Sequence, residues 1–170
     1  MNARGILVVL LLCSAARVTA ETDGPKLKGQ VSTNLKAMVS LKVPAKYRGP
    51  LALALPPRVR ITVFKLSAAG IAMSGDADSV DDVSEFMRGL NNIVWCPKGM
   101  GRVVERKRDG NFRVELIGSE AEILENNPAE IGFFFSNIEL KGTQMDTSSV
   151  SKSGNKAVKF EMTLTVNLAI

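Results

Sequence analysis

The feature that most constrains this chain is a strict alternation of apolar and polar residues near its C-terminus. From Val158 to Leu168 every second residue is apolar, and the residues between them are Lys159, Glu161, Thr163, Thr165 and Asn167. Alternate side chains of a strand point to opposite faces. The segment therefore predicts a long strand with one buried and one solvated face, which is typical of an antiparallel sheet covered on one face by a helix.

Residues 58–90 predict a hairpin followed by the covering helix. Residues 58–66 alternate in the same way, Gly70 permits a tight turn, and residues 71–75 form a second strand-like run. Ser79 is a suitable N-cap for a helix over residues 80–90. The apolar residues of this segment fall on one stripe at helical spacing: Val83, Phe86, Met87, Leu90 and Ile93.

A second hairpin is predicted around Asp109-Gly110, a dipeptide that favours a tight turn between two strands. Its arms are residues 101–108 and 111–118. The first arm is charged at its tip, so we expect the tip to project into water. Residues 120–126 predict a short helix, which ends before Asn127-Pro128.

The remaining segments have weaker patterns. Residues 137–144 predict a strand, and residues 145–154 predict a polar loop. Residues 21–50 are interpreted as a lead-in, in which residues 31–43 form one short strand or a partly helical segment. Long elements are disfavoured here by Gly24-Pro25, Gly29, Pro44 and Gly49-Pro50.

Residues 1–20 have the pattern of a secretory signal peptide. Arg4 gives a positive start, residues 6–13 are apolar, and Val18 and Ala20 are the residues that a signal peptidase reads. Retention as a membrane anchor is the alternative, but the apolar stretch falls short of the about 20 residues that span a bilayer. We therefore expect an exported protein with a signal peptide (1–20), a lead-in (21–50) and one domain (51–170).

The composition argues against the commonest enzyme classes. The chain has 170 residues and no His, which removes His-based acid–base catalysis, Ser-His triads and His-ligated metals. It has two Cys, and signal cleavage would leave only Cys96. The 22 basic and 17 acidic residues give only a mild positive charge. We expect no enzyme activity, no cofactor and no metal.

The densest acidic group consists of Asp76, Asp78, Asp81 and Asp82. One interpretation is a calcium loop, since carboxylates are the ligands that calcium prefers. The spacing lacks the central Gly and the closing Glu of an EF-hand loop. The alternative, which we favour, is that these carboxylates stabilise the N-terminus of the following helix.

The basic tip of the second hairpin is a candidate interaction site. Arg106, Lys107 and Arg108 are consecutive and predict either a patch for a phosphate or lipid or, as the favoured interpretation, a solvated hairpin tip. Export and the lack of interleaved aromatic residues argue against nucleic acid as a partner.

The aromatic run Phe133-Phe134-Phe135 is a second candidate interaction site. Three consecutive side chains of a strand cannot all lie on one face, so at least one is expected to stay exposed unless a helix covers it. The run predicts either a docking patch or core burial of at least two of the rings, and we favour burial.

Several segments resemble the periplasmic domain of PilN, a fimbrial assembly protein of type IV pilus machines. The first is LPPRVRIT at 55–62, followed by IAMSGDA at 71–77. The helix with FMRGL at 86–90 resembles the next element of that family. FSNIEL at 135–140 and FEMTLTV at 160–166 resemble its last two strands.

The resemblance implies a ferredoxin-like antiparallel sheet with one main covering helix, to which this chain adds a β-hairpin. Residues 94–134 stand as an insertion between the helix and the third family strand. The resemblance also implies a non-enzymatic scaffold that associates with PilO-like proteins of a pilus or secretion platform. A homodimer and association with the inner membrane are two further interpretations that the resemblance allows.

Two other functions remain as alternatives. The first is an exported binding module for a small or anionic ligand, which would use the basic hairpin and a cleft beside the helix. The second is a hydrolase with carboxylates such as Asp76 and Glu105. The sequence does not show whether these two acids converge.

Overall fold

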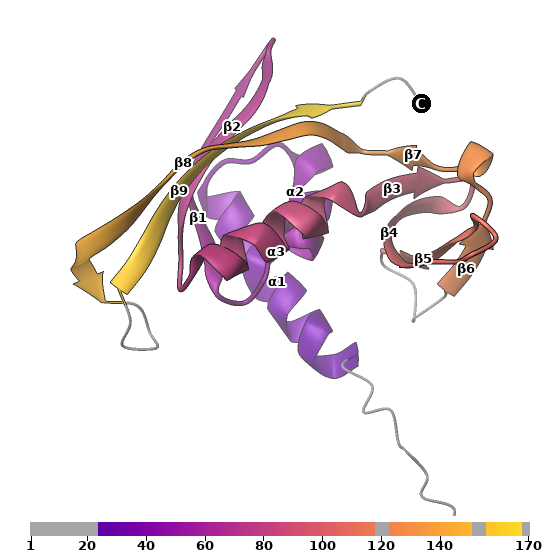
Figure 1. Cartoon of the computed structure of the whole chain (residues 1–170), viewed down its shortest axis with the longest axis horizontal. Helices are drawn as coiled ribbons and strands as arrows, with labels where there is room; N and C mark the ends of the chain where they lie inside the picture. The colour runs from indigo at the N-terminus through magenta and orange to yellow at the C-terminus, as the bar shows by residue number, and fades with distance from the viewer. Residues whose placement is uncertain (1–23, 118–122, 151–155, 168–170) are drawn as a thin grey trace, which may run out of the picture.

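The structure is a computed structural model that describes residues 24–117, 123–150 and 156–167. Within these residues it contains two sheets. The one with the longer strands, called the larger sheet below, consists of β1 (Val59–Ser67), β2 (Gly70–Ala77), β8 (Phe135–Val150) and β9 (Lys156–Val166). The strand order is β1-β2-β9-β8, and every neighbouring pair is antiparallel. Figure 1 shows both of its hairpins, β1–β2 and β8–β9, extending beyond the helices. The predicted signal peptide lies outside the described residues.

The alternating segment forms β9, the strand next to β2, as predicted. Val158, Phe160, Met162 and Leu164 are all buried, whereas the polar residues between them face away from the core. The buried residues pack against three helices that share one hydrophobic cluster with this sheet. The other face of the sheet is polar and open to solvent.

The predicted helix is α3 (Val80–Asn91), and it begins as the sequence indicates. The Ser79 hydroxyl accepts a hydrogen bond from the Asp82 backbone N–H at 3.1 Å and donates to the Asp82 carboxylate at 2.6 Å. Asp82 is buried, so the hydrogen bond from the Ser79 hydroxyl offsets part of the cost of burying its carboxylate. Val83, Phe86 and Leu90 are fully buried on the side that faces the sheet.

Replacing Ser79 with Ala is expected to destabilise the protein by about 1 kcal/mol, because it removes the N-cap. The free energy of unfolding from urea titrations measures the effect. Ser84→Ala, an exposed change within the same helix, is the control and should leave stability unchanged or slightly higher. Equal effects of the two substitutions would contradict a capping role for Ser79.

Two further helices precede the sheet, where the sequence predicted a lead-in without long elements. They are α1 (Gly24–Ser40) and α2 (Ala45–Ala54). The prediction of one main covering helix was therefore incomplete. The Asn34 amide of α1 donates to the carbonyls of Ala52 and Leu55 at 3.0 and 3.1 Å, which satisfies acceptors at the C-terminus of α2.

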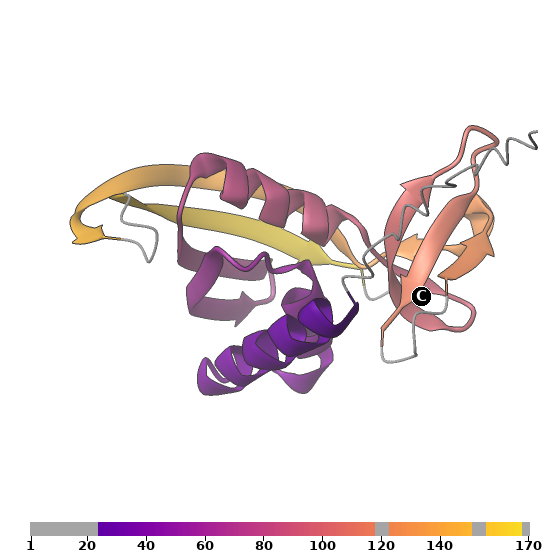
Figure 2. The same cartoon turned by 90° about the horizontal axis from the view of Figure 1, so that it is seen from below.

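A second antiparallel sheet replaces the single extra hairpin that was predicted. It has five strands in the order β6-β5-β4-β3-β7. They are β3 (Ile93–Cys96), β4 (Gly99–Arg106), β5 (Phe112–Leu116), β6 (Ile123–Asn126) and β7 (Gly132–Phe133), with a short 3-10 helix at Pro128–Glu130. β4 and β5 are the predicted hairpin. Figure 2 shows this sheet at the opposite end of the molecule from the β8–β9 hairpin.

Two local predictions were wrong. Residues 123–126 form β6 instead of the end of a helix, because they pair with β5 in the register Phe112↔Asn126. Residues 145–150 continue β8 instead of starting a loop, and Met145 pairs with Val158. In both cases strand pairing with a neighbour outweighs the local preference.

The second sheet coincides with the range that the sequence set apart as an insertion, residues 94–134. Its small core of Val94, Cys96, Val103 and Val114 forms a cluster separate from the main one. The chain leaves and re-enters the larger unit at one place, where the Phe134 N–H donates to the Ile93 carbonyl at 2.9 Å. The insertion therefore has a small core of its own beside the four-stranded sheet, while Trp95 and Met100 pack against the main core.

Candidate functional site

The aromatic run lies mostly in the core, as the favoured interpretation had it. Phe134 and Phe135 are 3% and 2% exposed, and their rings meet edge to face at 4.7 Å. Phe134 also contacts the rings of Tyr47 and Trp95 at 6.4 and 5.7 Å. These two rings join the main core to the second sheet, and they are not available as a docking surface.

Phe133 and Arg106, predicted as members of separate sites, lie together. The Arg106 guanidinium stands over the rings of Phe112 and Phe133 at 5.4 and 5.9 Å. The two rings meet edge to face at 6.4 Å, although β4 and β3 lie between their strands, β5 and β7. The second sheet must therefore curl, and Arg106 stacks on the contact that results.

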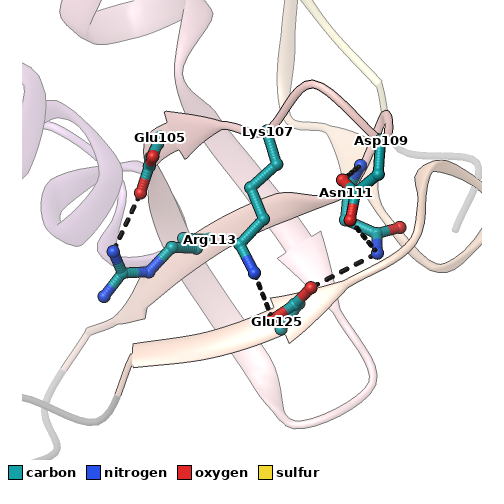
Figure 3. A network of polar contacts seen from close by, with 6 residues as sticks. All are labelled: Glu105, Lys107, Asp109, Asn111, Arg113 and Glu125. Carbon is teal, nitrogen blue, oxygen red and sulfur yellow. Dashed lines mark hydrogen bonds and ion pairs between the residues drawn. The ribbon is translucent and has the colours of Figure 1, made fainter.

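Of the other two cations of the hairpin tip, Lys107 is paired with a carboxylate and Arg108 is exposed; Arg113 and Arg102 of the hairpin arms are also paired (Figure 3). Lys107 lies 2.6 Å from Glu125, and Arg113 lies 2.8 Å from Glu105. At the base of the hairpin Arg102 lies 2.7 Å from Glu115. Such exposed pairs contribute little stability, because solvent screens the attraction. They also reduce the positive potential that an anionic ligand would need.

Glu125 is the acceptor on which this network converges. The hydrogen bond from Lys107 holds the pKa of the Glu125 carboxyl below its ordinary value of 4.5, and a second bond from the Asn111 amide acts in the same direction. Because the pKa of Glu125 is lower in the folded state than in the unfolded state, the hydrogen bonds to its carboxylate stabilise the fold at neutral pH. This contribution is lost as the pH falls through the folded-state pKa.

An NMR titration of the Glu125 carboxyl carbon is expected to give a pKa below 4.5 in the wild-type protein. In Lys107→Met the pKa should rise toward the ordinary value, because the main hydrogen bond is gone. Arg108→Met, which removes a neighbouring charge, should change it less. A Glu125 pKa that is the same in the Lys107 variant and in wild type would contradict the network.

The acidic group does not gather into a cation site. Asp82 is bound to Ser79, and Asp76 faces Arg60 across the β1–β2 pair. Among the residues that the structure describes, no three His, Cys, Asp or Glu side chains are grouped so that they could hold a metal ion. Asp76 lies on the larger sheet and Glu105 on the second, so the structure does not bring the two proposed hydrolytic carboxylates together.

The open face of the larger sheet carries a shallow hollow of about 670 Å³. It is lined by β1, β2, β8 and β9, with Thr62, Ser74, Asp76, Gln144, Lys159 and Glu161 among its side chains. Lys159 lies 2.9 Å from Asp146, and this hydrogen bond raises the pKa of the Lys159 ammonium. The lining mixes polar and apolar atoms with charges of both signs, and the hollow is too open to enclose a ligand as a typical small-molecule pocket does.

Exposed sheet edges that pair with a similar domain were expected from the sequence, but the strand that supplies a free edge, β1, was not identified. β1 is the terminal strand of the larger sheet, and among the described residues no strand pairs with its other edge. Val63 and Leu66 of this strand are 41% and 48% exposed. The alternation of residues 58–66 predicted the strand, but the position of a strand within a sheet depends on long-range pairing.

Among the described residues no helix is both long and apolar enough to cross a membrane. The chain was compared with protein-family models, with curated proteins and with solved structures, and none of the three comparisons found a match.

Proposed function

We propose that this chain is an exported, non-enzymatic scaffold of the cell envelope that resembles the periplasmic domain of PilN and acts by associating with other proteins. The main support for the proposal is where the segments that resemble PilN lie in the structure. The segments that resemble PilN fall on β1, β2, α3, β8 and β9, which form one continuous unit. The intervening residues, which the resemblance leaves out, form the separate second sheet. The gap in the sequence resemblance therefore coincides with the second sheet, whereas α1 and α2 share the main core and lie outside the segments that resemble PilN.

The order of elements in the larger unit also supports the proposal. A ferredoxin-like unit runs strand, helix, strand, strand, helix, strand. If its ends are joined and the chain is cut before the first helix, the order becomes helix, strand, strand, helix, strand, strand. This is the order of α1 and α2, β1, β2, α3, β8 and β9. We therefore propose a permuted ferredoxin-like fold for this unit.

Association through the sheet suits the described surface better than chemistry does. The described carboxylates form no group of three that could hold a metal ion, Asp76 and Glu105 lie on different sheets, and three cations of the basic hairpin are paired. The sheet instead offers a free edge at β1, and backbone groups at such an edge can pair with a strand of another chain. We propose PilO-like envelope proteins as partners.

Site-specific photo-cross-linking in the cells that produce the protein tests this function. A cross-linking residue at Leu66, on the exposed end of β1, should capture a component of a pilus or secretion platform in the envelope fraction. The same residue at Ala129, on the exposed 3-10 helix of the second sheet, is the control. Recovery of the protein in the cytoplasm, or capture of no envelope assembly component, would count against the proposal.

A further inference from the structure

The free edge of β1 has apolar side chains that an added strand could cover on both faces of the sheet. Val63 pairs with Ser74 and lies on the open, polar face. Leu66 pairs with Ile71, which is buried in the main core, so Leu66 lies on the face that the helices cover. A strand added at this edge would therefore find one exposed aliphatic side chain on each face.

The charged residues of β1 and the residue before it are all basic. Arg58, Arg60 and Lys65 are all exposed, and residues 58–67 include no Asp or Glu. On the helix side Lys46 stands over the ring of Tyr47 at 4.8 Å, and Tyr47 contacts Phe64 of β1 at 6.4 Å. Cations therefore border the edge on both faces of the sheet.

Two acidic residues neighbour this edge: the Asp78 N–H donates to the Arg58 carbonyl at 3.2 Å, and Asp76 lies one strand further in. Asp76 of β2 is paired in register with Arg60, so it offsets part of the charge on the open face. An incoming strand would lie on the opposite side of β1 from Asp76. It would meet Lys65, Arg60 and Lys46 first, and these groups favour carboxylates in the incoming segment.

This pattern discriminates between partners. A second copy that added its own β1 would bring Arg60 and Lys65 against the same two cations, and like charges on adjacent strands are destabilising. An extended segment rich in Glu or Asp would instead pair its backbone with β1 and its carboxylates with these cations. Lysines at a free edge also discourage indiscriminate aggregation, which is consistent with selective pairing.

We infer that β1 is the docking edge for an extended, acidic segment of a partner protein, which adds to the larger sheet as a further strand. The inference rests on the proposed function, since it specifies the chemistry of the partner that such a scaffold would bind. The contact combines backbone hydrogen bonds along β1 with ion pairs to Arg60, Lys65 and Lys46. It is expected to weaken at high salt.

Fluorescence anisotropy with labelled synthetic peptides and the full chain tests the inference. A peptide in which Glu alternates with Val should bind, and a peptide in which Lys alternates with Val should not. The Glu peptide with alternate backbone amides N-methylated keeps its charge but cannot pair as a strand, and it should also fail to bind. Equal binding of the methylated peptide, equal binding of the Lys peptide, or no binding at all would overturn the inference.

Variants of the full chain locate the contact. Lys65→Glu should weaken binding of the Glu peptide about tenfold, because an attraction becomes a repulsion. Arg60→Glu is a second variant at the same edge, and Arg108→Glu, on the second sheet, is the control of equal charge change. Circular dichroism and Tm identify any variant that fails to fold. Unchanged binding by folded Lys65→Glu, or a solution dimer that either edge variant dissociates, would overturn the inference.

The two proposals fail separately. A chain with the cross-linking residue at Leu66 can also carry Lys65→Glu. If this chain still captures an envelope assembly component as efficiently as without Lys65→Glu, the scaffold function stands and the docking edge is overturned. If the Glu peptide binds at β1 but no envelope component is captured in cells, the edge stands as an acidic-strand site and the scaffold function fails.

Discussion

Replacing Phe160 with Ala is expected to lower the free energy of unfolding by about 3–5 kcal/mol. Phe160 is 1% exposed at the centre of β9, and its ring meets Phe86 of α3 edge to face at 6.2 Å. Removing the ring leaves a cavity between the sheet and its helix, which the surrounding side chains can fill only in part. Urea and thermal unfolding measure the loss.

A matched control lies on the neighbouring strand. Met145 of β8 is also a large apolar residue, but it is 67% exposed, so Met145→Ala should change stability by less than about 0.5 kcal/mol. If Phe160→Ala proved as mild as Met145→Ala, the common core of the sheet and the three helices would be incorrect.

Gly75→Ala is expected to destabilise the fold by about 3 kcal/mol, although it adds one methyl group. A Cβ atom at Gly75 would lie 2.2 Å from the Arg60 carbonyl oxygen and 2.7 Å from the Phe160 ring. The first contact is with the backbone of β1, so relief requires the β1–β2 pair to separate locally. The fitted free energy of unfolding gives the effect.

Gly142 provides the comparison for that substitution, since it is also a glycine of the larger sheet. A Cβ atom there would meet nothing within 4 Å, so Gly142→Ala should stay within about 0.5 kcal/mol of wild type. The difference between the two substitutions measures how tightly β1, β2 and β9 pack. Similar stabilities of the two variants would contradict the close approach at Gly75.

The elements that the sequence predicted well are those whose residues carry a local signal. β9 is specified by its strict alternation, and α3 is specified by Ser79 together with its apolar stripe. The β4–β5 hairpin follows from Asp109-Gly110, and Gly110 has the positive φ of 91° that favours glycine in such a turn. In each case the local preference and the final environment agree.

The elements that were missed depend on contacts between distant parts of the chain. α2 contains Gly49 and Pro50, which disfavour a helix, yet Tyr47 and Leu51 are buried against the sheet. Gly89, which a local view treats as a weak point of α3, lies where a Cβ atom would come within 2.6 Å of the Ala54 carbonyl of α2. Packing of α2 against the sheet and against α3 explains both the helix at Gly49-Pro50 and the glycine at position 89. A local sequence pattern contains no information about such packing.

The same limit applies to the candidate site. Arg106 and Phe133 were each found in the sequence, but their stacking depends on a curled sheet whose strands meet across β3 and β4. The pairing of Lys107 with Glu125 depends on β6, which the sequence analysis interpreted as helical. Residue type could identify the charges, whereas only the fold determines which of them remain unpaired.

The narrow junction of the second sheet has a consequence for how such a chain can change during evolution. Ile93 and Phe134 are neighbours through a single hydrogen bond, so the polypeptide departs and returns at nearly the same point. Apart from Trp95 and Met100, which pack against the main core, the residues between them could be shortened or exchanged without altering the order of the four strands of the larger sheet. A chain shortened in this region would keep the same four-stranded architecture, and the exposed residues of the second sheet are where new surface chemistry could be acquired at least cost to the main core.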